Sequence, residues 1–419
     1  MNEKIIFHAD VNSAFLSWEA TYRKDRGIDS VDLRTVPSIV GGDIQKRRGI
    51  VLAKSVPAKK YGIQTGEPVV SAIRKCPFLI VVPPTYGLYA KCSANFMALL
   101  KQYSPIVEQY SVDECFLDCT QAIKSASDPI SLANEIRERA KKELGFTVNI
   151  GISSNKLLAK MASEFEKPDK THTLFPHEIE EKMWPLDIAE LFMVGRKTAQ
   201  QLRSLGILTI RDLAQADLEF LIRHFKRSRG LMLYQYARGL DLSSVRNIPL
   251  QAKSVGNSTT LPHDVCTRKD ALLVILSLCE MVGKRLRAKS LHGNLISVSF
   301  KNFAFRYYSA QQKIYTMTNQ TQQIYEACIP LFDTLWKGDA IRHLGVCVSN
   351  LSDSGISQPS FFDLQETIIR SRVDSTIDEI RTKFGNGSIM RASFAQSKHP
   401  PICGGPQNRD NFPMMKSGL

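Results

Sequence analysis

The sequence predicts a multidomain α+β protein with more than one compact core, and three observations support this. A chain of 419 residues is longer than one hydrophobic core usually spans, so two to four domains are expected. Strand-like and helical segments alternate in the first part of the chain, and the pattern becomes helical from residue 188. A polar linker at 242–254 then precedes a second mixed α/β segment.

The first predicted strand leads into an acidic residue. Residues 4–9, KIIFHA, form a short apolar run that continues directly into Asp10. Residues 106–117 give two apolar stretches interrupted by Asp113 and Glu114, which is typical of a hairpin with an acidic pair at or near its turn. Acidic side chains are therefore expected at the ends of separate strands.

Further elements complete this first unit and lead into a helical region. Helical patterns at 88–102 and 130–143 and the strand-like TVNIGIS belong to the same mixed unit. The glycines and basic residues of 40–73 suggest a small domain inserted over the acidic centre. MVGRKTAQQLRSLGI gives a turn, an amphipathic helix and a stop at Gly206, which resembles a helix-hairpin-helix element.

The segment after the linker is basic and again mixed. Its 246–351 portion holds 13 basic and 6 acidic residues, which is half of the net charge of +14. This concentration indicates a module that grips a polyanion. The chain beyond about 395 is rich in Pro, Gly, Ser and Asn and is expected to be disordered. The expected elements of this module are helices at 270–288 and 319–336 and strands at 295–301 and 343–349.

Composition excludes several classes of protein. No run of eighteen apolar residues occurs, and the N-terminal residues lack the apolar core of a signal peptide, so a protein that is neither exported nor membrane-spanning is expected. The nine cysteines show no paired C-x-x-C spacing, which argues against a disulfide framework and a zinc site. Reduced thiols, many of them buried, are expected.

The acidic residues suit phosphoryl transfer. Two divalent cations roughly 3.5–4 Å apart can activate a 3′ hydroxyl and hold a triphosphate. Asp10 from one strand and the consecutive Asp113 and Glu114 from a hairpin would supply carboxylates for both ions, and magnesium suits such oxygen ligands. Each residue alone is more simply read as a solvated polar group, so the argument depends on their combination.

Several motifs give the chain a resemblance to a known family. HADVNSAFLSWE and YSVDECFLD resemble the first and second motifs of Y-family polymerases, the translesion class of DNA polymerases. The order of R-G-x-V, A-K-K-Y-G, S-V-D-E and G-I-S-x-N-K-x-x-A-K agrees as well, over about residues 1–351. The resemblance implies a right-hand polymerase with a ferredoxin-like palm, small fingers, a helical thumb with a helix-hairpin-helix, and an α/β little finger.

The resemblance also implies domain boundaries. They are a palm at 1–13 and 85–172, fingers at 14–84, a thumb at 173–241, a linker at 242–252, a little finger at 253–351 and a C-terminal tail at 352–419 with a clamp-binding-like motif.

In this family the acidic residues hold metal. The resemblance implies that Asp113 and Glu114 are catalytic, and that these two, Asp10 and the backbone carbonyl of Val11 bind two Mg²⁺ ions per active site. Asn12 stands where many members have a second Asp, as in UmuC-like members. The family expectation is therefore the bacterial UmuC-like/DinB-like branch, with the UmuC-like side favoured.

Three residues take the family's nucleotide-binding positions. Phe15 matches the steric-gate aromatic, which packs under the sugar and excludes a 2′ hydroxyl. Lys59 matches the triphosphate arginine as a point charge in place of a bidentate group, and Lys160 matches a helix lysine. Val56 departs from the phosphate-contacting tyrosine of the family. Without the resemblance, Phe15 is equally a core residue and the lysines are solvated surface groups.

DNA contacts are expected from the thumb and the little finger. Backbone amides at a helix N-terminus bind phosphate without reading sequence, although Met193 replaces the usual first glycine of the thumb motif. A simple helix-turn-helix packing element is the alternative, and solvated charge is the alternative in the little finger, where Ser297 and Ser299 add hydroxyls. The expected DNA-binding residues are Gly195, Lys197, Thr198, Lys284, Arg285, Arg287 and Lys301.

A short motif follows the little finger. QPSFF at 358–362 resembles the Q-L-x-L-F peptide by which bacterial polymerases bind the sliding clamp. Gln358, Phe361 and Phe362 would be its contacts. The alternative is that both rings pack on the little finger or on a tail helix near 373–384.

The sequence thus predicts a low-fidelity, DNA-directed DNA polymerase for translesion synthesis. The resemblance implies a monomeric cytoplasmic enzyme of DNA damage tolerance, DNA repair and the SOS response, with primed DNA, dNTPs and a sliding clamp as partners and no membrane. A DNA-binding paralogue with weak or no polymerase activity is the alternative. A metal-dependent nuclease or a nucleotidyl cyclase would use a similar acidic centre.

Overall fold

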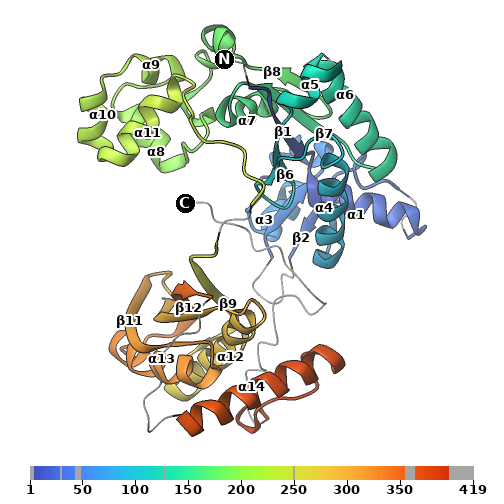
Figure 1. Cartoon of the computed structure of the whole chain (residues 1–419). Coiled ribbons are helices and arrows are strands. Elements are labelled where there is room, and N and C mark those ends of the chain that lie inside the picture. The colour runs from blue at the N-terminus through green and yellow to red at the C-terminus, as the bar shows by residue number, and fades with distance from the viewer. Residues whose placement is uncertain are drawn as a thin grey trace. The chain divides into compact units, whose positions relative to one another are not determined.

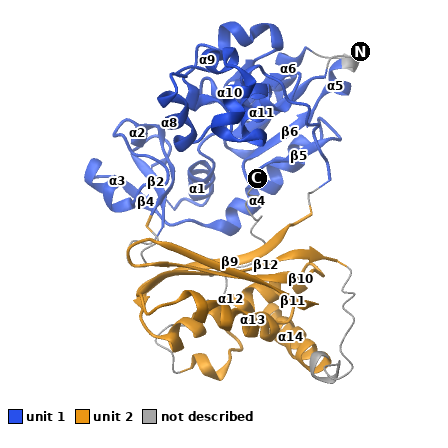
Figure 2. Ribbon diagram, turned by 90° about the vertical axis from the view of Figure 1, so that its left-hand side faces the viewer, with its two compact units in different colours: residues 1–42, 50–249, 409–419 blue, residues 43–49, 250–408 orange. Residues whose placement is uncertain are grey.

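The computed structural model describes residues 4–28, 31–42, 49–126, 128–248, 251–353 and 364–395. They form two compact units (Figures 1 and 2). Unit 1 holds the described residues of 4–42 and 50–248, and unit 2 holds those of 251–395. Each unit has hydrophobic clusters of its own, as expected for a chain with more than one core.

The first part of unit 1 is built on a five-stranded sheet with the order β5-β6-β1-β7-β8. Strand β1 lies in the centre, antiparallel to β6 and β7, and β8 runs parallel to β7. The strands are β1 (Ile6–Val11), β5 (Val107–Gln109), β6 (Glu114–Asp118), β7 (Val148–Ser153) and β8 (Thr171–Thr173). The helices are α1 (Ala14–Asp25), α4 (Tyr86–Leu100), α5 (Thr120–Ala126), α6 (Pro129–Arg139), which a π-helical turn (Ala140–Leu144) continues, and α7 (Lys156–Glu164).

Alternation along β1 sorts its side chains between the two faces of the sheet. The odd-numbered residues enter the main hydrophobic core together with α1, α4 and α6. Ile6 instead packs against Ala159 of α7 on the other face. Gly151 of β7 permits this close approach, since a Cβ there would lie 2.0 Å from the Ala159 carbonyl oxygen. Asp10 shares the parity of Ile6 and therefore lies on the face that α7 covers.

A smaller three-stranded sheet, with the order β3-β2-β4, lies between α1 and α4 in the chain. It packs on a separate cluster that includes Ile39, Val51 and Val69. This is the small inserted region expected from the glycine-rich and basic segment. Its elements are β2 (Ser38–Gly41), β3 (Val51–Lys54), α2 (Val56–Lys59), α3 (Val69–Lys75) and β4 (Ile80–Val82).

The last part of unit 1 is helical, as its sequence pattern predicts. Its helices share a core that includes Leu202, Leu213 and Leu221. Gly206 follows the first of them with a φ of 82°, the left-handed conformation with which many helices end. The helices are α8 (Arg196–Ser204), α9 (Ile210–Gln215), α10 (Leu218–Phe225) and α11 (Arg227–Ala237), preceded by short turns at Pro176–Glu178, Ile179–Met183 and Ile188–Glu190.

The chain that leaves α11 is fastened to the five-stranded sheet. The carboxylate of Glu108 on β5 accepts from the backbone N–H and the guanidinium of Arg246, each at 2.9 Å. The same carboxylate accepts from Lys156 at the start of α7, also at 2.9 Å. The linker expected at 242–254 is therefore held as far as Arg246, and β9 begins at Ser254.

Unit 2 is a four-stranded antiparallel sheet with the order β11-β10-β12-β9. Figure 2 shows α12 and α13 side by side on one face of this sheet. The expected helices and two of the strands are confirmed, and β9 and β11 are additional strands. The elements are β9 (Ser254–Val265), α12 (Arg268–Arg287), β10 (His292–Asn302), β11 (Tyr307–Thr318), α13 (Thr321–Leu335), β12 (Ile341–Ser352), α14 (Leu364–Phe384) and a short turn at Ala392–Phe394.

Helix α14 is held to α12 by charged contacts. Arg287 of α12 donates to Asp378 at 2.6 Å and to Asp374 at 3.0 Å. Two turns earlier, Glu280 accepts from Arg381 at 3.0 Å. A tail helix over 373–384 is thus confirmed, and it begins earlier than expected.

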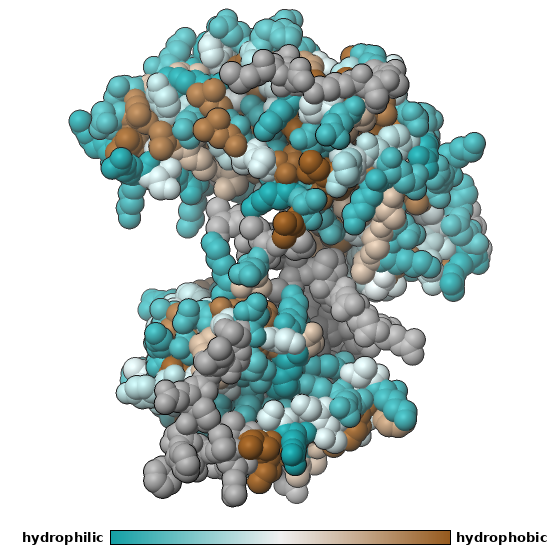
Figure 3. Space-filling model, viewed as in Figure 1, coloured by the Kyte–Doolittle hydropathy of each residue, from teal (hydrophilic) through white to brown (hydrophobic). Residues whose placement is uncertain are grey.

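The described surface is largely polar on the face shown in Figure 3, where hydrophobic residues form small separate patches. Among the described helices, none is both long and apolar enough to cross a membrane. The described cysteines are free thiols, and Cys76, Cys115, Cys119, Cys279 and Cys328 are buried, as expected.

Candidate active site

Three carboxylates meet where α7 crosses the five-stranded sheet. Asp10 of β1 stands directly opposite Glu114 of β6 in the antiparallel ladder, so the sheet register brings them together. Glu164, the last residue of α7, completes the group. One carboxylate oxygen of each residue lies within 4.8 Å of the others.

The two residues of the predicted acidic pair, Asp113 and Glu114, have different surroundings. Glu114 joins the carboxylate group, whereas Asp113 lies in the turn before β6 and its carboxylate accepts from the Ser111 hydroxyl at 2.5 Å. The Asp113 carbonyl oxygen accepts from the N–H of Val11 at 3.1 Å, which ties the turn to the end of β1. The backbone of Asp113 is thus held beside the carboxylate group, while its side chain is hydrogen-bonded to Ser111.

Two lysines balance the carboxylates. Lys160, on the same face of α7 as Glu164, donates to Glu114 at 2.8 Å and lies over the rings of Tyr110 and Phe192. Lys167 donates to Asp10 and lies 2.9 Å from Glu164.

Burial and crowding make this group electrostatically strained. Burial raises the pKa of Asp10 to about 6, with Lys167 opposing the rise and Glu114 adding to it. Burial also raises the pKa of Asp113, while the hydrogen bond from Ser111 opposes the rise. Carboxylates that resist ionisation in this way are stabilised by a bound cation, and their oxygen atoms are the ligands that Mg²⁺ and Mn²⁺ prefer. The donor set therefore fits a divalent metal.

Sequence reasoning missed Glu164 and Lys167. Helix α7 follows GISSN, and Lys160 and Glu164 are four residues apart, so they lie on one helix face. That spacing, combined with the assigned role of Lys160, is the signal that could have identified Glu164. Lys167 lies beyond the helix, and no periodicity indicates it.

Phe15 lies in the first turn of α1, five residues after Asp10. Its ring stacks on that of Tyr89 with centroids 4.4 Å apart and is only partly buried. The hydroxyl of Tyr89 donates to the buried carboxylate of Glu19 at 2.7 Å, which fixes the orientation of the Tyr89 ring. Phe15 thus has a rigid support on one side and is not a fully enclosed core residue.

The two remaining nucleotide-binding candidates differ in their surroundings. Lys160 contacts the carboxylate group through Glu114. Lys59 ends α2 in the smaller sheet region and is exposed, and Val56 at the start of α2 is 54% exposed. Among the described residues, Lys59 forms no hydrogen bond or ion pair with the carboxylates of Asp10, Glu114 and Glu164.

The candidate phosphate-binding turn lies directly before α8. Gly195 precedes α8 in an extended conformation, Lys197 is exposed, and the buried Thr198 accepts from Arg229 at 2.7 Å. Met193, where a glycine is usual, has a φ of 71°. Glycine is usual at this position because it adopts the left-handed conformation without steric cost. Met193 keeps that conformation although it has a side chain.

Of the basic residues predicted to bind DNA in unit 2, the three on α12 are engaged within the unit. Arg287 binds α14, Lys284 donates to Asn386 at 2.9 Å, and Arg285 donates to the Gly256 carbonyl oxygen at 3.0 Å. Burial lowers the pKa of Arg285. Lys301 on β10 is exposed, on the face of the sheet opposite to the helices. The expectation of a basic surface therefore retains support at Lys301.

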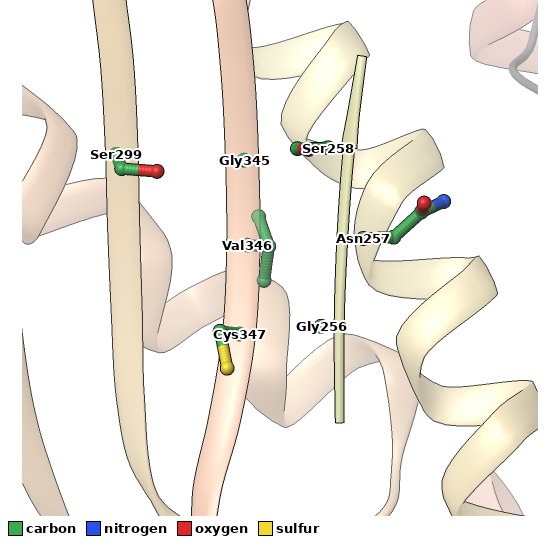
Figure 4. A pocket seen from close by; sticks show the side chains of 7 residues that line it. All are labelled: Gly256, Asn257, Ser258, Ser299, Gly345, Val346 and Cys347. Atoms are coloured by element: carbon green, nitrogen blue, oxygen red, sulfur yellow. The ribbon is translucent and has the colours of Figure 1, made fainter. Parts of the chain in front are cut away.

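The helix-free face of the unit 2 sheet contains a shallow hollow of about 330 Å³ (Figure 4). Small residues of β9, β10 and β12 line it, and a side chain added at either of two glycines would crowd a neighbouring strand. A Cβ on Gly345 would lie 2.9 Å from the Ser299 hydroxyl oxygen, and a Cβ on Gly256 would lie 3.1 Å from the Cys347 Cβ. The lining residues are Gly256, Asn257, Ser258, Ser299, Gly345, Val346 and Cys347.

The candidate clamp motif lies outside the described residues. Gln358, Phe361 and Phe362 fall between the end of β12 and the start of α14.

Comparison with known proteins identifies three matching regions. The chain matches models of the impB/mucB/samB family over 9–164, of the thumb domain of DNA polymerase-iota over 190–241 and of the impB/mucB/samB family C-terminal domain over 252–361.

Whole-chain relatives agree with these matches. DNA polymerase IV of Clostridium acetobutylicum is 45% identical over 395 residues, which cover 94% of this chain and 99% of that protein. DNA polymerase IV 2 of Bacillus subtilis is 35% identical, with 94% and 95% covered. A solved Y-family DNA polymerase chimera, Dbh-Dpo4(243-245)-Dbh, has the same fold, with a TM-score of 0.72, 24% identity, and 83% of this chain and 98% of that chain covered.

Proposed function

The chain belongs to the DNA polymerase IV group of the Y-family DNA polymerases, and from this premise we propose how its residues carry out translesion synthesis. It is a DNA-directed DNA polymerase with the palm, fingers, thumb and little finger of that fold. The observation that carries the proposal is the pairing of Asp10 with Glu114 across adjacent strands, beside Glu164.

The DNA polymerase IV relatives favour the DinB-like side of the bacterial branch, so the UmuC-like preference drawn from Asn12 is not supported. The contacts of Asn12 give it a packing role instead. Its amide donates to the Asn149 side-chain oxygen at 3.1 Å and accepts from the Asp169 N–H at 2.9 Å. An aspartate at this position would turn a carboxylate oxygen toward the acceptor atom of Asn149, at an unfavourable energy.

We propose that Asp10, Asp113, Glu114 and the backbone carbonyl of Val11 hold two Mg²⁺ ions. When bound, these ions supply activation of the primer 3′ hydroxyl and stabilisation of the triphosphate charge. The ladder fixes the spacing of Asp10 and Glu114, and the bond from Val11 to Asp113 fixes the turn beside them. The Asp113 carboxylate accepts from Ser111 through one of its oxygens, so its other oxygen would bind a metal ion.

Incoming nucleotide would be held by residues around this group. Lys160 would neutralise triphosphate charge, and its present partner Glu114 places it beside the reacting atoms. Lys59 would add a weaker, solvated contact. Phe15, supported by Tyr89, would fill the volume next to the sugar.

Primer extension is the direct test of the function. A primed DNA template with all four dNTPs should be extended when Mg²⁺ is present and not when it is chelated. Degradation of the DNA, or cyclisation of a nucleoside triphosphate without extension, would instead indicate a nuclease or a cyclase.

We propose that duplex DNA passes over the helix-free face of the unit 2 sheet and over the turn before α8. Small, uncharged side chains in the hollow would let a sugar-phosphate backbone approach closely, and Lys301 would add charge. Gly195, Lys197 and Thr198 would present backbone amides and one cation to phosphate. Such binding reads no sequence, as a template-directed enzyme requires.

Thiol alkylation can test this path. Cys347 lines the hollow, whereas Cys266, also in unit 2, is exposed between β9 and α12. Duplex DNA at about ten times its Kd should slow alkylation of Cys347 by N-ethylmaleimide roughly tenfold, because only free protein reacts. Mass spectrometry would follow both cysteines, and Cys266 is the control. Equal rates at Cys347 with and without DNA would contradict the path, and high salt should abolish the protection.

The tail motif supports a clamp-binding proposal at the level of sequence. Gln358 would orient the peptide, and Phe361 and Phe362 would fill a pocket on the sliding clamp. The double change Phe361→Ala and Phe362→Ala should remove clamp-stimulated synthesis and leave extension without the clamp unchanged. Full clamp stimulation of the variant would reject this role.

The domain boundaries that the family resemblance implies remain a proposal. They are palm 1–13 and 85–172, fingers 14–84, thumb 173–241, linker 242–252, little finger 253–351 and tail 352–419. Helix α1, which the boundary at 14 assigns to the fingers, shares its hydrophobic core with the five-stranded sheet. That boundary therefore follows the motif and not the packing. We further propose that the enzyme acts as a low-fidelity monomer in the cytoplasm, in DNA damage tolerance and the SOS response.

A further inference from the structure

Lys167 has a position that the roles assigned so far do not explain. Its ammonium donates to the carboxylate of Asp10 and lies 2.9 Å from that of Glu164, so it sits among the oxygen atoms that fit a metal ion. Lys160 contacts only Glu114 of this group. The two lysines thus divide the three carboxylates between them.

The backbone around Lys167 is fixed independently of its side chain. On one side, the Glu166 carbonyl oxygen accepts from Asn149 at 2.7 Å. On the other side, the Asp169 N–H donates to Asn12 at 2.9 Å, and its carboxylate accepts from Arg137 at 2.8 Å. These bonds remain when the ammonium moves, so the side chain can leave the carboxylates without refolding of the loop.

The Lys167 side chain is 32% exposed, whereas that of Asp10 is only 10% exposed. The ammonium therefore has solvent to enter when it leaves, while the carboxylate has little water to replace it. A cation beside Asp10 stabilises its ionised form, and either the ammonium or a metal ion can supply that charge.

We propose that Lys167 is the resting counter-ion of the carboxylate group and that a divalent metal ion binds by displacing its ammonium from Asp10 and Glu164. This inference rests on the proposed function, because it takes Asp10 to be a metal ligand, and it adds Glu164 as a neighbouring carboxylate that Lys167 also holds. Metal can bind only to molecules in which the internal cation has left the ligands. The apparent affinity for metal is therefore the intrinsic affinity multiplied by the fraction of molecules in that state. Lys167 thereby sets how tightly the free enzyme holds metal.

Metal binding without turnover tests the proposal. Metal-free protein is titrated with Mn²⁺ at pH 8, and free Mn²⁺ is measured by electron paramagnetic resonance. Lys167→Met, which removes the charge and keeps the length of the side chain, should bind Mn²⁺ about tenfold or more tightly than the unchanged protein. Lys167→Arg, which retains a cation, should bind nearly as the unchanged protein does.

Lys170→Met is the matched control. Lys170 lies three residues further along the same loop, is half exposed and approaches only Glu166, at 3.8 Å. Its loss removes the same charge from the loop without freeing a ligand, so Mn²⁺ affinity should change less than about twofold. Equal gains in Lys167→Met and Lys170→Met would reduce the effect to net charge and overturn the proposal.

A second readout separates this inference from the proposed function. Without metal, Lys167→Met should melt at a lower temperature than the unchanged protein, and saturating Mn²⁺ should raise its melting temperature by more. If Asp10→Asn abolishes Mn²⁺ binding while Lys167→Met leaves it unchanged or weaker, the metal site stands and the role of Lys167 is wrong. If Asp10→Asn leaves Mn²⁺ binding unchanged, the metal site itself is wrong, and the role of Lys167 with it.

Discussion

Glu114→Ala is expected to lower the rate of primer extension by roughly a hundredfold to a thousandfold, since removal of one preorganised charge at a reacting centre costs roughly 3–4 kcal/mol. Glu114 is the member of the carboxylate group that faces Asp10 across the ladder and also binds Lys160. Its loss leaves two carboxylates for the metal ions and frees the lysine that should meet the triphosphate. Asp113→Ala should have a comparable effect, because its carboxylate is proposed to bind the same metal ions.

DNA affinity should remain within about twofold in both variants, because the proposed DNA contacts lie in other parts of the chain. Rates would be measured under single-turnover conditions and affinity by fluorescence anisotropy. Glu166→Ala is the matched control. Glu166 lies near Glu164 in the chain, its side chain is largely exposed, and its ion pair with Lys170 is long, at 3.8 Å. Substantial extension by Glu114→Ala would reject the metal assignment. A full rate for Asp113→Ala would show instead that its carboxylate is not one of the metal ligands.

Phe15→Ala is expected to raise the ratio of ribonucleotide to deoxyribonucleotide insertion by roughly tenfold to a hundredfold. A 2′ hydroxyl forced against a fixed ring costs about 1–3 kcal/mol of overpacking, which corresponds to that range. The ring cannot retreat easily, because Tyr89 stacks against it and Glu19 fixes the Tyr89 hydroxyl. Insertion efficiencies for rNTP and dNTP opposite the same template base give the ratio.

Phe15→Tyr keeps the ring and should keep the ratio. If Phe15 serves only the core, Phe15→Ala should instead lower the melting temperature and both insertion rates while the ratio stays constant. The two roles therefore differ in a quantity that general destabilisation does not change.

Local pattern was sufficient for the centre of the site. An apolar strand that runs into Asp10 and a hairpin with Glu114 at its turn predict two carboxylates on neighbouring strands, and the ladder confirms that they face each other. The third carboxylate could not be predicted with the same ease. Glu164 reaches the others only because Gly151 allows α7 to lie against the sheet, and that is a tertiary contact.

In unit 2, local pattern was not sufficient to predict the first strand or the partners of the basic residues. The start of β9, SVGNSTT, is not predicted as a strand, because its glycine, asparagine and serine side chains lower the apolar alternation that marks a strand. Those small residues line the hollow. The basic end of α12 was assigned to DNA because charge alone does not reveal a partner. Arg287 instead binds Asp374 and Asp378 of a helix that lies almost ninety residues later in the chain.

The attachment of Arg246 to Glu108 limits how far unit 2 can travel from unit 1. Only residues 247–253 separate the fastened arginine from the first residue of β9, and such a tether reaches at most roughly 28 Å when fully extended. On the DNA path proposed above, a unit that releases DNA on so short a tether faces the same duplex at an effective concentration on the order of millimolar. Each unit can then bind DNA weakly on its own, while the whole enzyme dissociates from DNA slowly. Glu108→Gln would lengthen the free tether and lower that concentration, so the fastened linker acts as a setting for how long the enzyme stays on its template.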